Sequence, residues 1–261
     1  MAFYALMRLM KIRPGDEVVI LGSTCAVMAN AVLRIGAVPI YSDINPETFG
    51  SSLQGVIDKL SVKTKLVVIQ HTFGIPCEEN IDIEIFKKRG VFVLEDCALS
   101  LGTRVADKQL GGFGDAALFS TDHGKPLNTL VGGGIYSKDQ DLIEGLRAIR
   151  EFSSEVPATI QRSMKRQIIF ERQYCRPEKF SAFDLASAIR GVWRRVQRAP
   201  KPFFTNNYSI KTFQEPYPFP AKFPAFLAAL GLFEISLAEL YFQERRDLLA
   251  RLRTLFPTKS E

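Results

Sequence analysis

The chain has 261 residues, of which 46% are hydrophobic and 24% charged, and its formal net charge is +6. This length and balance are ordinary for a globular protein that buries one large core or two small ones. The sequence contains no run of 18 apolar residues, no zinc-ligand spacing and no nucleic-acid-binding motif, so we expect no membrane-spanning helix, no metal and no nucleic-acid partner.

The start of the chain and its cysteines indicate a compartment. Residues 1–12 are apolar but lack the basic segment and the cleavage site of a signal peptide. The four cysteines follow no recognisable spacing. We therefore expect free thiols and a cytoplasmic location.

The first 151 residues alternate short apolar runs with helical patterns, which is typical of a mainly parallel sheet flanked by helices. Strands are predicted at 17–21, 38–41, 66–70, 91–94, 116–119 and 134–137. Helices are predicted at 3–10, 26–35, 53–60, 83–88 and 140–151. Ligands of such sheets bind at the carboxyl ends of the strands.

The pattern changes after residue 151. Residues 152–223 are predicted to form a basic insert or linker, helical to about residue 200 and irregular over 201–223, and residues 224–261 to form a helix pair. The excess positive charge gathers in 161–201, at Arg162, Lys165, Arg166, Arg190, Arg194, Arg195 and Arg198. A solvated helix face, a collar for a diphosphate substrate and a contact with an anionic membrane all fit such a stretch, and the sequence leaves them open.

Candidate chemistry lies between residues 91 and 136. Asp96 follows one hydrophobic strand, and Lys125 follows the next, in a loop of small and hydroxyl-bearing residues that begins near Ser120. Pyridoxal 5'-phosphate (PLP) needs an amine that condenses with its aldehyde, an acid that keeps its pyridine nitrogen protonated, and phosphate ligands. Spacing alone leaves open a plain α/β domain whose strand ends carry an acid and a lysine.

Several ordered motifs also carry a family resemblance. They lie at 13–18, at 36–39 followed by Asp43, at 71–76, at 94–98, at Ser120 and Lys125, and at 132–133. In this order they resemble the DegT/DnrJ/EryC1/StrS family of sugar aminotransferases, closely over residues 2–150 and loosely over 215–255. The Gly132–Gly134 run lacks the Gly-Lys-Ser/Thr of a phosphate loop, so we expect it to allow close backbone approach.

The resemblance implies an α/β fold, namely the large domain of a fold-type I PLP-dependent transferase over 1–151, followed by a helical carboxyl-terminal part. It implies that Lys125 is the catalytic lysine that carries PLP, that Asp96 pairs with the pyridinium nitrogen and that Ser120 binds phosphate. The full set of cofactor-binding residues that it implies is Cys25, Asp96, Ala98, Ser120, His123 and Lys125. For His123, an exposed loop position without such a role is an equal alternative.

The resemblance further implies transfer of an amino group from an amino acid to a nucleotide-linked keto-sugar, within a homodimer whose subunits complete each other's sites. Three positions depart from the family pattern: Cys25, where relatives stack an aromatic ring on the cofactor, Leu99 and Val131. The chain resembles a member trimmed at both ends, without the phosphate-binding turn and with a truncated small domain after 224–261. The alternative is a non-catalytic scaffold or regulatory relative that binds PLP weakly or not at all.

Overall fold

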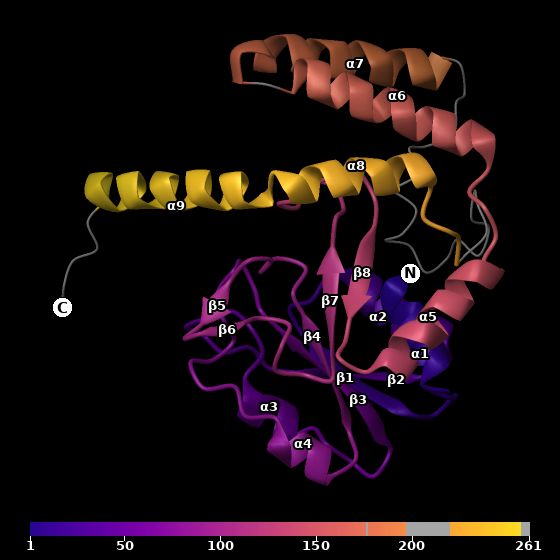
Figure 1. The fold of residues 1–261 in the computed structure, drawn as a ribbon, viewed down its shortest axis with the longest axis vertical. Helices are drawn as coiled ribbons and strands as arrows, with labels where there is room; N and C mark the ends of the chain where they lie inside the picture. The colour runs from indigo at the N-terminus through magenta and orange to yellow at the C-terminus, as the bar shows by residue number, and fades with distance from the viewer. Residues whose placement is uncertain (176, 197–219, 257–261) are drawn as a thin grey trace. The chain divides into compact units, whose positions relative to one another are not determined.

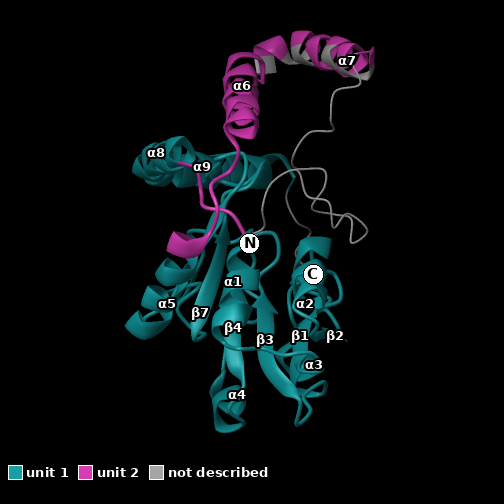
Figure 2. Cartoon of the chain, turned by 90° about the vertical axis from the view of Figure 1, so that its right-hand side faces the viewer, with its two compact units in different colours: residues 1–149, 225–261 teal, residues 150–224 magenta. Residues whose placement is uncertain are grey.

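The computed structural model describes residues 1–175, 177–196 and 220–256. They divide into two compact units, Met1–Ile149 with Ala225–Glu261, and Arg150–Pro224 (Figure 2). Unit 1 contains the sheet and the candidate site. Unit 2 is helical.

The sheet of unit 1 has the strand order β2-β1-β3-β4-β7-β8 (Figure 1). Its first five strands are parallel, and β8 pairs antiparallel with β7. The strands are β1 (Glu17–Leu21), β2 (Val38–Ser42), β3 (Thr64–Gln70), β4 (Phe92–Asp96), β7 (Ala116–Ser120) and β8 (Gly133–Tyr136). The mainly parallel α/β architecture expected from the sequence is confirmed.

Helices cover both faces of this sheet because successive strand residues point to opposite sides. Val18 and Ile20 of β1 join one core with α1 and α2, while Val19 joins the other core with α3 and α4. The helices are α1 (Ala2–Leu9), α2 (Ala26–Arg34), α3 (Leu53–Ile57), α4 (Glu84–Lys88) and α5 (Gln140–Phe152). Burial on both faces explains why the central strands read as continuous apolar runs.

Two details of the sheet differ from the sequence prediction. Strand β4 continues two residues beyond Leu94, so that Glu95 and Asp96 pair with Ile69 and Gln70 of β3. A short antiparallel ribbon, β5 (Arg104–Val105) with β6 (Lys108–Gln109), was not predicted. Strands of two residues carry no periodicity that a sequence pattern could detect.

Helices α8 (Ala225–Ser236) and α9 (Ala238–Leu255) complete unit 1. A side chain built at Gly231 of α8 would contact Thr129, and one at Gly102 would meet the ring of Phe242 in α9 at 2.9 Å. Of the described helices, none is by itself long and apolar enough to cross a membrane; α8 and α9, bent by 53° where they join, meet that test only as a pair.

Unit 2 contains α6 (Ala158–Tyr174), the 3-10 turn η1 (Pro177–Lys179) and α7 (Phe180–Val196). Lys222 lies 3.8 Å from a carboxylate oxygen of Glu151 and 3.7 Å from one of Glu155. Most of the irregular segment expected at 201–223, with Arg198 and the side chains of Arg190, Arg194 and Arg195, lies outside the described residues.

The glycine run at the start of β8 allows the close backbone approach that the sequence predicts. Gly133 pairs with Ser120, has φ +156°, and an added Cβ would lie 2.4 Å from the carbonyl oxygen of Phe119. Gly134, its neighbour, has nothing within 4 Å of the same position. The absence of a side chain at Gly133 therefore keeps β8 in register beside Ser120.

Replacing Gly133 should test this packing. We expect Gly133→Ala to lower the free energy of unfolding by roughly 2–3 kcal/mol, because backbone strain and a backbone clash both oppose it. Gly134→Ala is the matched control and should stay within about 0.5 kcal/mol of the parent. Chemical denaturation of the three proteins measures both values, and equal stability of the two variants would contradict the role given to Gly133.

Candidate active site

Asp96 lies at the carboxyl end of β4, near the middle of the sheet, and is 6% exposed. Its Oδ1 accepts a hydrogen bond from the backbone N–H of Ala98 at 3.0 Å. Among the described residues, no hydrogen-bond donor reaches its Oδ2. Burial raises the pKa of Asp96, and the Ala98 bond and the positive charge of Lys125 oppose that rise. The site thus offers, on a residue that is largely buried, a carboxylate oxygen that suits a cationic partner.

Lys125 lies in a loop whose two ends are joined by hydrogen bonds. Thr121 and Thr129 join the two ends of the loop through their hydroxyls at 2.6 Å and through a Thr129 N–H to Thr121 C=O bond at 2.9 Å. The N–H of Lys125 donates to the carbonyl of Asp122 at 3.0 Å. Lys125 is half-buried, and the described residues give its amine no ion-pair partner within 4 Å. The charge of Lys125 nevertheless acts on Asp96.

Ser120 is the last residue of β7, the strand beside β4. Its Oγ accepts a hydrogen bond from the N–H of Asp122 at 3.3 Å, which leaves the hydroxyl proton available to an acceptor. Strands β4 and β7 run parallel, so their carboxyl ends lie at the same edge of the sheet. This edge carries Asp96, Ser120 and the Lys125 loop.

The remaining residues predicted to contact the cofactor are Cys25, Ala98 and His123. Cys25 caps α2, just after β1, and is exposed; within the described residues no hydrogen bond joins it to Asp96 or Lys125. Ala98 supplies the N–H that binds Asp96. His123 is exposed, and its backbone N–H donates to Asp122 and to Leu130. The structure therefore brings together Asp96, Ala98 and Lys125, with Ser120 at the base of the loop.

Polar side chains continue along this edge, at the ends of β1 and β3. Thr24 donates to the Oε1 of Gln70 at 2.6 Å, and the Nε2 of Gln70 donates to Thr72 at 3.0 Å. Gln70, the last residue of β3, pairs with Asp96, the last residue of β4. The edge therefore offers hydroxyl and amide groups next to the buried acid.

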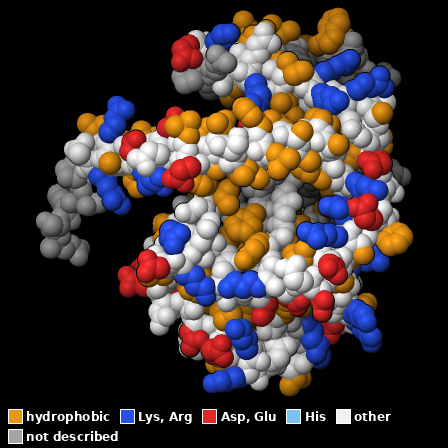
Figure 3. Space-filling model, viewed as in Figure 1, with side chains coloured by type: hydrophobic (Ala, Val, Ile, Leu, Met, Phe, Trp, Pro, Cys, Tyr) orange, Lys and Arg blue, Asp and Glu red, His pale blue; other side chains and the backbone are white. Residues whose placement is uncertain are grey.

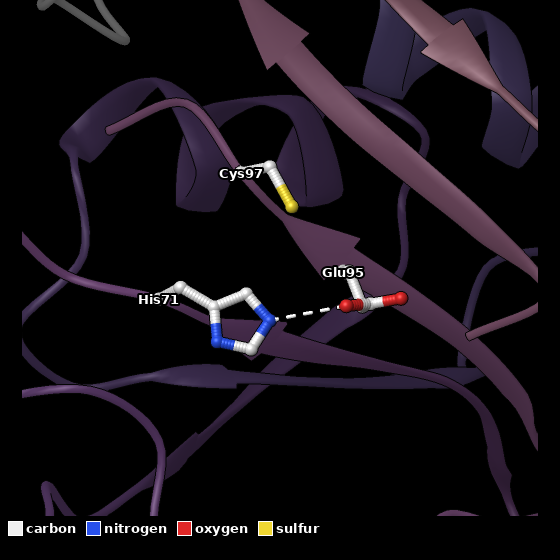
Figure 4. A group of neighbouring side chains, drawn as sticks. All are labelled: His71, Glu95 and Cys97. Atoms are coloured by element: carbon white, nitrogen blue, oxygen red, sulfur yellow. Dashed lines mark hydrogen bonds and ion pairs between the residues drawn. The ribbon is translucent and has the colours of Figure 1, made fainter. Parts of the chain in front are cut away.

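Glu95, the neighbour of Asp96, forms a second buried network that the sequence reasoning missed. Its carboxylate is fully buried and accepts backbone N–H bonds from Gly111 at 2.9 Å and from Phe113 and Gly114 at 2.6 Å each. The Nε2 of His71 lies 3.2 Å from its Oε2 (Figure 4). Glu95 thus ties two segments of the chain, the turn 111–114 and His71 after β3, to the strand that carries Asp96.

The hydrogen bonds of His71 define its tautomer. Its Nδ1 accepts from the N–H of Cys77 at 3.1 Å, so Nε2 carries the proton and donates to Glu95. Burial acts to raise the pKa of Glu95, but the bonds from His71, Gly114 and Gly111 outweigh it and lower that pKa. A sequence signal did exist: in a strand buried on both faces, adjacent acids at Glu95 and Asp96 must face opposite ways, and each needs its own donors.

The same cluster resembles a metal site in composition only. Ligand atoms of His71, Glu95 and Cys97 lie within 4.8 Å of one another. Both ring nitrogens of His71 are already hydrogen-bonded, however, and burial raises the pKa of the Cys97 thiol well above its usual value. A metal would require the thiolate and a free ring nitrogen. We therefore interpret the group as a structural hydrogen-bond network.

We expect Glu95→Gln to destabilise the protein by roughly 2–4 kcal/mol, because either amide orientation sets its NH₂ against a backbone N–H. The lowered pKa of Glu95 determines how its contribution to the free energy of unfolding changes with pH. Stability contributed by Glu95 is complete above the ordinary glutamate pKa of 4.5 and is lost as the pH falls through the lower folded value. Denaturation of both proteins across acidic pH measures this difference. Exposed Glu84→Gln is the control, and an equal loss in that variant would contradict the network.

A hollow of about 540 Å³ lies at the opposite edge of the sheet, where β4 and β7 begin. Its lining includes Lys87, Asp115, Tyr136 and Lys138. It contains neither Asp96 nor Lys125, so it is separate from the candidate site.

The chain is similar to several known proteins. The sequence profile of the DegT/DnrJ/EryC1/StrS aminotransferase family matches residues 1–172. GDP-perosamine synthase from Escherichia coli O157:H7 is 35% identical over 133 residues, 51% of this chain and 36% of that protein. UDP-N-acetyl-3-dehydro-alpha-D-glucosamine 3-aminotransferase from Acidithiobacillus ferrooxidans is 30% identical over 154 residues, 59% and 42% of the two chains. The chain thus spans about two fifths of the length of these relatives.

A solved structure extends the similarity to the rest of the fold. The putative sugar aminotransferase Spr1654 from Streptococcus pneumoniae, in its PMP form, superposes with a TM-score of 0.64 over 98% of this chain and 59% of its own length. At 17% identity, this likeness concerns the fold alone.

Proposed function

Because the chain belongs to the DegT/DnrJ/EryC1/StrS aminotransferase family, we propose that it takes part in PLP-dependent transfer of an amino group from an amino acid to a nucleotide-linked keto-sugar. The observation that carries this proposal is geometric: buried Asp96, whose Oδ2 lacks a donor among the described residues, and the loop of Lys125 emerge at the same edge of the sheet, where the lysine charge acts on Asp96. The cofactor would supply an aldehyde that condenses with the lysine and a ring that accepts electrons.

The described residues fit the cofactor. Asp96 would form an ion pair with the protonated pyridine nitrogen. Burial raises the pKa of the Asp96 carboxyl, and a cationic partner would favour its ionised form. Ser120 would donate its hydroxyl proton to the phosphate. Cys25, Ala98 and His123 are proposed as further residues that contact the cofactor. Ala98 also orients Asp96 through its backbone N–H.

Lys125 would also move the proton of the reaction. When not joined to the cofactor, its Nζ would take a proton from the α-carbon of the donor amino acid and deliver it to the carbon that the cofactor's aldehyde supplies, which a permanently charged arginine cannot do. The hydroxyl-closed loop between Thr121 and Thr129 would restrict where that amine can reach.

The relatives support a sugar-nucleotide acceptor without defining which one. The names of the two relatives specify a GDP-linked and a UDP-linked sugar. We propose glutamate as the amino donor. We propose the synthesis of polysaccharide or sugar precursors as the setting.

Homodimer formation and a cytoplasmic location are part of the proposal. Phe49 and Phe73 are exposed near the site edge, at 50% and 72%, and their rings pack edge to face at 6.3 Å. Both have positive φ values, of about 56°, so the backbone holds them there under strain. Such a pair suits coverage by a second copy. All four cysteines are free thiols, as in a reducing compartment.

The test is transfer of nitrogen-15 from labelled glutamate to a nucleotide-linked keto-sugar by the cofactor-loaded protein, followed by mass spectrometry of the sugar. Labelled amino-sugar is the expected product. A protein that neither acquires PLP absorbance nor forms product across GDP-, UDP- and dTDP-linked acceptors would support the non-catalytic alternative instead.

A further inference from the structure

Helix α7 of unit 2 carries an exposed apolar stripe that the candidate active site does not use. Leu185, Ile189, Val192, Trp193 and Val196 are each between 59% and 71% exposed. Their spacing of three and four residues places them on one face of the helix. Side chains of this size that remain in water along one face indicate a surface that binds an apolar partner.

The segment that forms unit 2, which carries this stripe, is strongly basic in composition. Residues 150–224 contain 14 Lys and Arg against six Asp and Glu, although the whole chain carries a net charge of only +6. On the neighbouring helix α6, Arg162, Lys165, Arg166 and Arg172 are exposed. Figure 3 shows hydrophobic and basic side chains together over α6 and α7.

From this combination we propose that α7 binds in the plane of an anionic lipid membrane, with its stripe among the acyl chains and the basic groups of unit 2 near the headgroups. Amphipathic helices with Trp and Leu on one face and Lys or Arg around it bind lipid in this way, through apolar burial and attraction to anionic headgroups. An acidic lipid surface satisfies both features of the unit at once.

Other occupants satisfy only one of the two features. A second copy meeting α7 would bring the same excess of positive charge and would be repelled. A nucleic acid would neutralise the charge but would leave the aliphatic stripe without an apolar partner.

The sequence contains a single tryptophan, Trp193, which lies within the stripe. Its fluorescence therefore reports on this surface alone. The full chain would be mixed with vesicles of phosphatidylcholine, with or without about one third phosphatidylserine, and binding would be followed by flotation and by the emission maximum. We expect flotation and a blue shift only with the anionic vesicles. Binding should weaken as salt rises from about 0.15 M to about 1 M.

Two pairs of variants separate the apolar and electrostatic parts. Ile189→Gln with Val192→Gln should weaken partitioning by about tenfold or more, whereas Val62→Gln, at an exposed apolar position of unit 1, should not. Arg162→Glu with Arg166→Glu should weaken binding, and Lys63→Glu with Lys138→Glu, which changes the net charge equally on unit 1, should do so much less. Circular dichroism would confirm that each variant is folded.

Three results would overturn the proposal. The first is the absence of a Trp193 shift and of flotation with anionic vesicles. The second is equal binding to neutral vesicles, which would remove the electrostatic part. The third is conversion of a dimer to a monomer by the stripe variants, seen by light scattering, in a protein that ignores vesicles; it would assign the stripe to a second copy.

Discussion

Lys125→Ala is expected to abolish covalent attachment of PLP and to reduce amino transfer to background. The reason is chemical: among the residues proposed at this edge of the sheet, Lys125 alone has an amine that can condense with an aldehyde. Removing both the covalent link and the group that moves the proton should lower turnover by at least about 10⁴-fold, since positioned acid–base groups alone contribute about 10²–10⁴-fold. The measurements are visible absorbance after dialysis against PLP-free buffer and product formation.

Lys125→Arg separates charge from chemistry. It keeps the positive charge that acts on Asp96, but a guanidinium stays protonated and forms no imine, so this variant should be as inactive as Lys125→Ala. Lys138→Ala, an exposed lysine beside the hollow at the opposite edge of the sheet, is the control and should remain active. Retained absorbance after dialysis of Lys125→Ala would mean that another lysine carries the cofactor.

Asp96→Asn is expected to leave the fold intact while turnover falls by about 10²–10⁴-fold. Removing one partner of a buried ion pair costs roughly 3–5 kcal/mol, and a neutral amide no longer holds the ring nitrogen protonated. Steady-state kinetics at saturating PLP would measure the loss. Unchanged turnover would exclude the proposed partner of the pyridine nitrogen.

The cofactor-free protein offers a second, independent readout at Asp96. Burial raises the pKa of this carboxyl, so its ionised form destabilises the fold as the pH rises above the ordinary value of 3.8. Asp96→Asn removes that charge, and we expect the unloaded variant to be at least as stable as the parent at neutral pH. A marked loss of stability would show that Asp96 serves the fold rather than the site.

The fold could be predicted because its signals are periodic. Strands buried on both faces appear as apolar runs such as 66–70, and the helices between them have a single apolar face. The parallel order then places residues that follow β4 and β7 at one edge, which is why Asp96 and the Lys125 loop could be expected there before any coordinates.

For the supporting network, the adjacent acids Glu95 and Asp96 indicate only that each needs its own donors; which groups donate could not be predicted. Glu95 is bound by three backbone amides at Gly111, Phe113 and Gly114, and backbone donors leave no residue-type signature in a sequence. The closure of the Lys125 loop likewise depends on hydroxyls at Thr121 and Thr129, which are common residues in any loop. Such contacts arise from tertiary approach rather than from local pattern.

Borohydride reduction of the PLP-loaded chain, followed by peptide mass mapping of the pyridoxyl group, would identify the lysine that carries the cofactor. Reduction makes the lysine–cofactor link permanent, so the result depends on neither substrate nor turnover. We expect a single modified lysine, Lys125, in the loop closed by Thr121 and Thr129 at the same edge of the sheet as buried Asp96. Stoichiometric label on any other lysine, or no label at saturating PLP, would contradict it.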